Sequence, residues 1–317
     1  YFDENGITNL DDTAFDNVNN IEAIVLSDGD NNFTLGENAK LASSSEFLSI
    51  TTGDGADRID VSGLDNSTTI NAGGGSDVVL YGNKLNADDI VDGNGGSDEL
   101  IFFDVGLDRT DLNSVINVEA ITLGDAATDI TTVDSLVSEG QILTVTAVAL
   151  SGNNVLSFDG SSETDGIFNI TGSAQSDTIT GGFGADLIYA GAGFDTIIGG
   201  PGDDTIYGGD GQDIFAYLAK TDGVDTIHDF EVGSFGDIIN FVPLLSSLGY
   251  DSNNPLSDEI VILEQMGSDI EIKVKDPEID DYFTLAILKN VNGREWTQQN
   301  FLPIGTDPVY LIGTELS

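Results

Sequence analysis

The segment between Gly172 and Ala216 repeats every nine residues. Divided into nines, it reads GSAQSDTIT, GGFGADLIY, AGAGFDTII, GGPGDDTIY and GGDGQDIFA. The sixth place is always aspartate: Asp177, Asp186, Asp195, Asp204 and Asp213. The eighth place is always large and apolar: Ile179, Ile188, Ile197, Ile206 and Phe215. An internal repeat with such a short period predicts a solenoid, in which successive repeats stack on one another.

The residue types within each nine predict turns that hold a cation. Six residues of each repeat suit a turn and three suit a short strand. Glycine reaches positive φ without steric cost, so the turn can direct its carbonyl oxygens toward one point. The aspartate adds a carboxylate, and hard oxygen donors of this kind suit Ca²⁺. The candidate ligands beside the aspartates are therefore the turn glycines Gly181, Gly182, Gly184, Gly191, Gly193, Gly199, Gly200, Gly202, Gly208, Gly209 and Gly211.

Two nonapeptides would form one coil, so alternate turns would stack on the same edge. This arrangement predicts one edge with Asp177, Asp195 and Asp213, opposite a second edge with Asp186 and Asp204. Each ion would bridge one turn and the next turn on its own edge. Four positions carry another residue where glycine is expected, so the first repeat should hold its ion weakly or lack one: Ser173, Ala174, Gln175 and Ala190. The alternative is a flexible linker rich in Gly and Asp, which the regular apolar eighth place disfavours.

These repeats resemble the RTX nonapeptide G-G-x-G-x-D-x-U-x. The resemblance implies an all-β chain: a right-handed parallel β-solenoid, or β-roll, with several bound Ca²⁺ ions. It also implies a bacterial protein that is secreted to the extracellular space or the cell surface. Such proteins leave the cell through a type I ABC transporter, which would be a partner of this chain during export.

The charge of the chain fits a fold that depends on a metal ion. The sequence has 56 acidic and 9 basic residues, for a formal net charge of −47. Self-repulsion on this scale opposes a compact state, and an ion that binds only the native state would stabilise it. Plentiful apolar residues with clear periodicity argue against disorder. The same charge argues against nucleic acid and against a bare anionic membrane as partners.

Two further features of the sequence limit the class of protein. The chain has no cysteine, which excludes a disulfide framework and a thiolate metal site. No apolar run is long enough for a transmembrane segment. Because the sequence starts at Tyr1 without Met or a signal peptide, we expect it to be a fragment of a larger protein.

The region before the nonapeptides contains a longer repeat. FDNVNNIEAIVLSDG, from Phe15, matches LNSVINVEAITLGDA, from Leu112, at an offset of 97 residues. Downstream, STTINAGGGSDVV matches IFNITGSAQSDTI and aligns Asp77 with Asp177. We interpret these matches as a tandem duplication, with chance similarity as the alternative. The predicted regions are a first solenoid module at 1–107, a second copy at 108–171, the RTX β-roll at 172–230 and a β-rich cap and secretion region at 231–317.

The first module contains three degenerate turns, TTGDGADRI, AGGGSDVVL and GNGGSDELI. Their aspartates Asp57, Asp77 and Asp98 are 20 and 21 residues apart, close to one coil of a slightly wider solenoid. All three would lie on one edge as candidate calcium ligands. The alternative is ordinary Gly-Asp turn chemistry between strands.

After Ala216 the frame of nine breaks, but D-x-I pairs continue. Asp222 and Asp225 would close the last calcium turn on the edge of Asp204. Farther on, DEIVILEQMGSDIEIKVKD and YFTLAILKNVN alternate as antiparallel strands do, with GSD as the hairpin turn. Roughly residues 172–303 resemble the C-terminal cap and secretion region of type I-exported proteins. A repeat stack needs such a cover at its end.

The sequence contains no recognisable catalytic constellation. It lacks a G-x-S-x-G elbow, and its one histidine, His228, has no H-E-x-x-H context. We therefore expect a non-enzymatic, calcium-binding structural protein of the bacterial surface, of surface-layer or adhesin type. It would fold outside the cell and self-assemble with copies of itself, and cell-surface polysaccharide is a further expected partner. The alternatives are the export-and-folding module of a secreted exoenzyme or toxin, and a calcium-bridged glycan-binding module.

Overall fold

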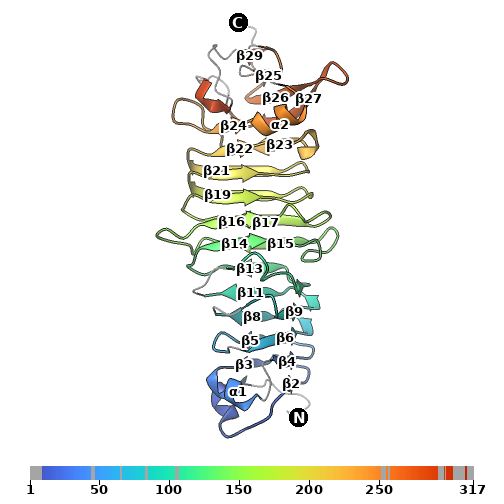
Figure 1. The fold of residues 1–317 in the computed structure, drawn as a ribbon, viewed down its shortest axis with the longest axis vertical. Coiled ribbons are helices and arrows are strands. Elements are labelled where there is room, and N and C mark those ends of the chain that lie inside the picture. The colour runs from blue at the N-terminus through green and yellow to red at the C-terminus, as the bar shows by residue number, and fades with distance from the viewer. Residues whose placement is uncertain are drawn as a thin grey trace. The chain divides into compact units, whose positions relative to one another are not determined.

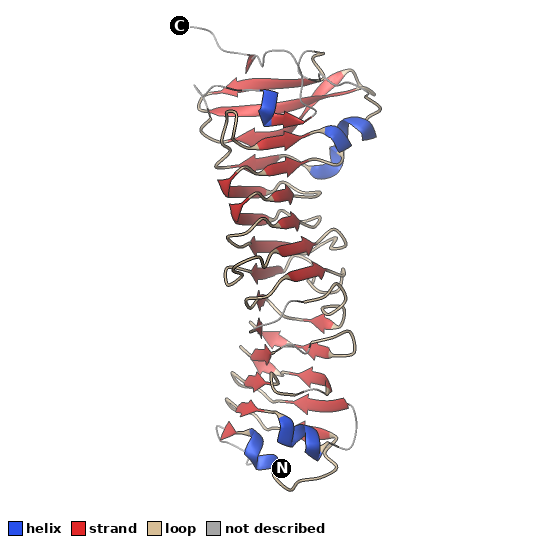
Figure 2. Ribbon diagram, turned by 60° about the vertical axis from the view of Figure 1, so that its left-hand side comes forward, coloured by secondary structure: helices blue, strands red, loops and turns tan. Residues whose placement is uncertain are grey.

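The computed structural model describes residues 9–43, 47–64, 66–82, 85–103, 107–250, 255, 258–291, 296, 298–302 and 311–312. They divide into two compact units, Tyr1–Asn154 (unit 1) and Val155–Ser317 (unit 2). Both units are built almost wholly of short strands joined by turns (Figures 1 and 2).

Unit 1 is a parallel β-solenoid with two main sheets. The first has the order β1 (Asn9–Leu10), β3 (Asn32–Thr34), β5 (Arg58–Asp60), β8 (Val78–Tyr81), β11 (Glu99–Phe102), β13 (Ala120–Thr122) and β15 (Ile142–Thr146). The second has the order β12 (Val115–Ile116), β9 (Ile90–Asp92), β6 (Ser67–Asn71), β4 (Phe47–Thr51) and β2 (Ala23–Val25). The turns contribute a short pair, β7 (Gly74–Gly75) and β10 (Gly95–Gly96). The remaining elements are β14 (Thr128–Thr131), η1 (Asp12–Phe15) and α1 (Glu37–Ala42).

The core of unit 1 consists of columns of aliphatic side chains. Along one column Ile24, Ile50, Ile70 and Val91 face each other in register on neighbouring parallel strands. Each is almost fully buried. Because strand side chains alternate between faces, the residues between them point outward. Burying a side chain of this size stabilises the fold by about 1.5–3 kcal/mol.

Unit 2 has the same architecture with shorter coils. One sheet has the order β17 (Ile167–Thr171), β19 (Leu187–Gly193), β21 (Thr205–Gly211), β23 (Asp225–Ile227), β27 (Asp281–Leu288), β26 (Asp269–Asp276), β25 (Val261–Met266) and β29 (Leu311–Ile312). The other has the order β16 (Leu156–Asp159), β18 (Thr178–Thr180), β20 (Thr196–Ile198), β22 (Ile214–Ala216), β24 (Ile238–Asn240) and β28 (Phe301–Leu302).

The nonapeptides form these coils in the predicted register. Thr178 pairs with Thr196, and Leu187 pairs with Thr205, so each strand pairs with the strand two nonapeptides later. The eighth-place residues point inward, and each is at most 2% exposed: Ile179, Ile188, Ile197, Ile206 and Phe215. The predicted parallel β-solenoid is therefore confirmed.

A β-rich cap covers the end of unit 2. Strands β25, β26 and β27 form an antiparallel meander, and the turn at Gly267 and Ser268 joins the first two, as the GSD pattern predicts. Strand β27 pairs in parallel with β23 and so attaches the meander to the last coil. The cap also contains α2 (Val242–Ser247) and the 3-10 helices η2 (Lys220–Asp222) and η3 (Gln298–Asn300). Parts of the predicted cap region, including 303–310 and 313–317, lie outside the described residues.

The helices of the described residues are short. None of them has the length and apolar character needed to cross a membrane.

Candidate metal centre: the aspartate ladders

The sixth-place aspartates of unit 2 form a hydrogen-bonded ladder along one edge. The backbone N–H of Asp177 donates to Oδ1 of Asp195 (2.7 Å), and that of Asp195 donates to Oδ1 of Asp213 (2.9 Å). The ladder continues when the N–H of Asp213 donates to Oδ1 of Asp237 (2.9 Å). Each carboxylate thus holds the preceding coil in register. We name Asp177, Asp195, Asp213 and Asp237 the first ladder.

A second ladder runs along the opposite turns. The N–H of Asp186 donates to Oδ1 of Asp204 (2.8 Å), and the N–H of Asp204 donates to Oδ1 of Asp225 (3.1 Å). Below them, the N–H of Phe168 donates to Oδ1 of Asp186 (2.8 Å). We name Asp186, Asp204 and Asp225 the second ladder. The structure thus places the sixth-place aspartates on two edges, in the alternation that the repeat predicts.

Three ladder carboxylates keep one oxygen unsatisfied. Oδ2 of Asp195, Asp204 and Asp213 is buried without a hydrogen-bond partner, and each of these residues is at most 1% exposed. A buried ionised oxygen without a partner is costly, because it loses its contacts with water and gains none. These three oxygens therefore need a positive charge or a proton.

The glycines bring backbone carbonyls to the same edges. In the last two full repeats the second and fourth places have positive φ, for example +96° at Gly209 and +147° at Gly211. A Cβ at Gly211 would collide with the carbonyl oxygen of Gly193, and one at Gly209 with that of Gly191. At the first place of a repeat, a Cβ would instead collide with the carboxylate of the same turn, as one at Gly199 would with Asp204. Gly181, Gly200, Gly202 and Gly208 follow the same scheme. Gly182 and Gly184 differ, because neither has a positive φ, and a Cβ at Gly182 would meet Phe168 and Glu163.

Burial disfavours the ionised form of the ladder carboxylates. Burial, together with the charges of Asp213 and Asp177, raises the pKa of Asp195 to about 7. Burial likewise raises the pKa of Asp237 to about 7 and that of Asp186 to about 6. Burial also raises the pKa of Asp204 and of Asp225, and neighbouring carboxylates add to both shifts: Asp225 for Asp204, and Asp222 and Asp203 for Asp225. The ladders therefore place acidic groups where a charge is unfavourable unless a cation is near.

The donor set fits calcium. In the part of the chain that the structure describes, no three carboxylate or histidine side chains gather around one point. The turns of Asp195, Asp204 and Asp213 instead each offer one free carboxylate oxygen beside the carbonyl oxygens of stacked glycines. Ca²⁺ accepts six to eight oxygen ligands of these two kinds in flexible geometry. When bound, it would supply the positive charge that the buried oxygens lack.

Asp177 and Asp186 differ from the other ladder members. Oδ2 of Asp177 accepts the N–H of Ser173 (2.7 Å), and Oδ2 of Asp186 accepts the N–H of Gly182 (2.7 Å). The hydroxyl of Ser173 donates to Oδ1 of Asp177 as well (3.0 Å). Both carboxylates are thus satisfied by their own turns, and at Asp177 this fits the weak first site expected from its missing glycines.

The two aspartates predicted after the repeats occupy different places. Asp225 extends the second ladder beyond Asp204. Asp222 accepts the N–H groups of Leu218 (2.6 Å) and Ala219 (3.0 Å), and so caps the short helix η2.

Two residues of these edges were missed by the sequence reasoning. Asp237 belongs to the first ladder, and its signal was the continuing pattern of aspartate followed two residues later by isoleucine. Glu163 is fully buried, and its Oε2 has no hydrogen-bond partner. Its carbonyl accepts the N–H of Phe183 (3.1 Å), which places it beside the turn before Asp186. Nothing in the repeat pattern indicates Glu163, because it lies in a loop of different length.

In unit 1 the three degenerate turns also lie on one edge. The N–H of Asp57 donates to Oδ1 of Asp77 (2.8 Å), and that of Asp77 donates to Oδ1 of Asp98 (2.8 Å). The ladder is longer than the sequence suggested. The N–H of Asn31 donates to Asp57 (2.7 Å), and Glu119 accepts the N–H of Asp98 (2.7 Å).

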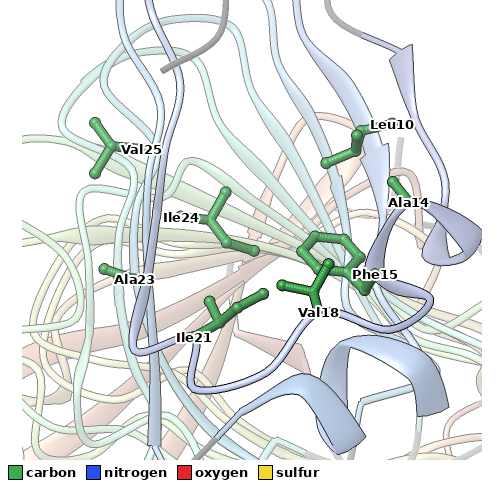
Figure 3. A pocket seen from close by; sticks show the side chains of 8 residues that line it. All are labelled: Leu10, Ala14, Phe15, Val18, Ile21, Ala23, Ile24 and Val25. Carbon is green, nitrogen blue, oxygen red and sulfur yellow. The ribbon is translucent and has the colours of Figure 1, made fainter.

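The only histidine and the apolar cleft are not part of these edges. His228 stacks on Tyr207, with ring centroids 4.7 Å apart, and Tyr207 stacks on Tyr189 at 4.5 Å. At β2, the end strand of its sheet, an apolar cleft of about 510 Å³ opens (Figure 3). Its lining is entirely apolar and offers no acid–base group: Leu10, Ala14, Phe15, Val18, Ile21, Ala23, Ile24 and Val25.

Comparison with known proteins identifies the repeat of unit 2. The family model of the RTX calcium-binding nonapeptide repeat matches residues 169–197 and 191–217. Repeats of this family bind calcium and are typical of secreted proteins that leave the cell by type I export. A search of curated proteins gave no match to the chain. The matched segment contains the five sixth-place aspartates, so the chain contains RTX calcium-binding nonapeptide repeats.

Proposed function

We propose that the chain is a non-enzymatic structural part of a bacterial cell-surface protein, of surface-layer or adhesin type, which folds when it binds calcium outside the cell. At low cytosolic calcium the ladders would stay charged and the chain unfolded, as export requires. Outside, calcium would neutralise the turns and fix the coils.

The observation that carries this proposal is the set of free oxygens on Asp195, Asp204 and Asp213. All three carboxylates are buried in a chain with a formal net charge of −47. Without a counter-ion, folding would bring these charges together in surroundings of low polarity. Because calcium would bind the native state only, its binding energy becomes folding energy.

Thermal unfolding with and without a chelator tests the calcium part. We expect calcium to raise the melting temperature strongly and magnesium to raise it much less, since Mg²⁺ requires tighter octahedral geometry. The far-ultraviolet circular dichroism of the chelated chain should show less β-structure. An unchanged melting temperature after removal of calcium would refute the proposal.

The structural role requires a separate test. Calcium should convert the isolated chain into ordered assemblies, or should bind the chain to cells that do not produce this protein themselves. Light scattering and electron microscopy after calcium addition would detect assembly, and binding to purified cell-wall polysaccharide would detect a surface partner. A chain that folds with calcium, stays monomeric and binds neither cells nor polysaccharide would contradict the surface role while leaving calcium binding intact.

A second candidate is the export-and-folding module of a secreted exoenzyme or toxin. The attachment of the cap meander to the last RTX coil, through β27 and β23, favours it. The test is a fusion of the whole chain behind an unrelated enzyme in cells with a type I transporter. Export of an active passenger that needs calcium would support this role, and retention of the fusion in the cytosol would argue against it.

A further inference from the structure

Unit 1 contains an edge built like the RTX edges, although it lies outside the segment that the family model matches. Its members are Asp57, Asp77 and Asp98, and each carboxylate accepts a backbone N–H from the coil before it. The residues are 1%, 1% and 3% exposed. We name them the unit 1 ladder.

Each carboxylate of the unit 1 ladder has a free oxygen. Oδ2 of Asp57, Asp77 and Asp98 is buried without a hydrogen-bond partner. Asp195, Asp204 and Asp213 have the same unsatisfied atom. The neighbouring basic residue Arg58 does not supply the missing charge, because it pairs with Asp60 (3.4 Å).

The backbone of these turns also repeats the RTX geometry. Gly73 and Gly75, which precede Asp77 by four and two residues, have φ of +93° and +135°. The equivalent RTX residues Gly209 and Gly211 have φ of +96° and +147°. Before Asp98, the corresponding angles are +66° at Asn94 and +152° at Gly96.

Carbonyl oxygens line the edge between successive turns. A Cβ at Gly73 would collide with the carbonyl oxygen of Gly53, and one at Gly75 with that of Gly55. At the next turn, Gly96 lies in the same way against the carbonyl of Gly75. Strands β7 and β10 keep these last two turns parallel and in register.

We propose that the unit 1 ladder is a second calcium array. One ion would lie between the turns of Asp57 and Asp77, and another between those of Asp77 and Asp98. The donors would be the free carboxylate oxygens and the glycine carbonyls of adjoining turns, a set of hard oxygens that suits Ca²⁺ better than Mg²⁺. The inference depends neither on a cell-surface role nor on calcium in the RTX turns.

The electrostatics of the edge agree with this assignment. Burial, together with the charges of Asp98 and Asp57, raises the pKa of Asp77 to about 6. Burial also raises the pKa of Asp98 to about 6, with a further contribution from Glu119. A cation between the turns would favour the ionised carboxylates and so offset both shifts.

Hydrogen exchange of the whole chain, followed by mass spectrometry of its peptides, tests the proposal. Calcium should slow exchange in peptides that cover 53–57, 73–77 and 93–98, by about tenfold at a free calcium concentration about ten times the dissociation constant. Peptides from the RTX turns serve as an internal reference. Protection of the RTX peptides without protection of the unit 1 peptides would overturn the proposal, since these turns would then be ordinary Gly-Asp turns.

Variants extend the test to the ligands. Asp77→Asn keeps an oxygen that can accept the N–H of Asp57. It removes the carboxylate charge that both proposed calcium positions share. Native mass spectrometry should show fewer bound calcium ions for this variant, with RTX protection unchanged. Asp88→Asn, which removes an exposed charge from another loop of unit 1, should bind as many ions as the parent. Equal losses in both variants would show an unspecific effect of charge and overturn the proposal.

The wild-type exchange experiment needs no substitution, so it remains decisive even if Asp77→Asn fails to fold. Asp195→Asn adds the reverse case. It should reduce protection in the RTX peptides and leave that of the unit 1 peptides in place. Loss of unit 1 protection in this variant would mean that the effect came from the RTX array.

Discussion

Replacement of Asp195 by asparagine should stabilise the chain without calcium and destabilise it with calcium. Asparagine keeps an oxygen that can accept the N–H of Asp177 but carries no charge. The pKa of Asp195 lies at about 7, which is about 3 above its ordinary value of 3.8. At about 1.4 kcal/mol for each pKa unit, the native state loses about 4 kcal/mol at neutral pH by holding this carboxylate ionised.

The substitution removes this penalty in the chelated protein. Part of the gain is offset, because the new amide N–H₂ needs partners, at a cost of about 1–3 kcal/mol if it finds none. We therefore expect a net stabilisation of about 1–3 kcal/mol, or roughly 2–10 °C in the melting temperature. With calcium the same variant loses a charged ligand. Each tenfold loss of affinity then removes about 1.4 kcal/mol at saturating calcium.

Denaturant unfolding followed by circular dichroism, in chelator and in calcium, measures both effects. Asp210→Asn is the matched control, because it removes one exposed charge from a turn on the same edge. The control should shift stability by a few tenths of a kcal/mol in either condition. The reasoning fails if Asp195→Asn destabilises the chelated protein as much as the calcium-bound one. Equal stability of variant and parent in calcium would show that this carboxylate is no ligand.

Three further predictions concern the same unit. Gly211→Ala should lower the stability of the calcium-bound chain, because alanine is strained at a φ of +147°, at a cost of roughly 1–3 kcal/mol, and its Cβ would also collide with a carbonyl oxygen. Gly267→Ala, with open space around its Cβ, should cost less, and thermal unfolding of both variants measures the difference. In chelator, the free energy of unfolding should fall as pH rises from about 4 to about 7, because native Asp237, with its pKa raised to about 7, still binds a proton that the unfolded chain has released. Urea titration at several pH values measures this, and a free energy of unfolding that rises across that window would contradict it. Lys220→Met removes the ion pair with Asp276 and should destabilise the cap at neutral pH. The effect should disappear only in strong acid, because the lowered pKa of Asp276 keeps this carboxylate ionised until the pH is low, and unfolding midpoints at two pH values measure the difference.

The regular part of the fold was predictable because one repeat fixes strand length, core face and coil length together. A period of nine with an apolar eighth place leaves one way to bury Ile188 and Ile206, and the structure has that arrangement. Outside the nines the coils vary in length. The step from Asp213 to Asp237 is longer than the eighteen residues of a repeat pair, because η2 and its turn are inserted.

Ladder members with another side chain were not predictable from the sequence. Asn31 and Glu119 extend the unit 1 ladder at its two ends, but neither matches a pattern defined by aspartate. Only hydrogen bonds between coils identify them, because the N–H of Asn31 donates to Asp57 of the next coil and Glu119 accepts the N–H of Asp98 from the coil before it. The tandem duplication stays a prediction, and its matched residues Ile24 and Ile121 lie in two different sheets of unit 1.

The ladders explain why so acidic a chain can both stay unfolded and fold. Each ladder carboxylate accepts a hydrogen bond from a backbone N–H of the coil before it, which favours stacking whatever the metal concentration. The second oxygen of Asp195, Asp204 and Asp213 has no partner and opposes stacking until a cation or a proton arrives, in agreement with the raised pKa of Asp195. Since neighbouring rungs repel one another, the cost of an uncompensated ladder grows with its length, and so does the gain from calcium. A long ladder should therefore fold over a narrower range of calcium concentration than a short one, and removal of one central rung should broaden the transition more than removal of a terminal rung.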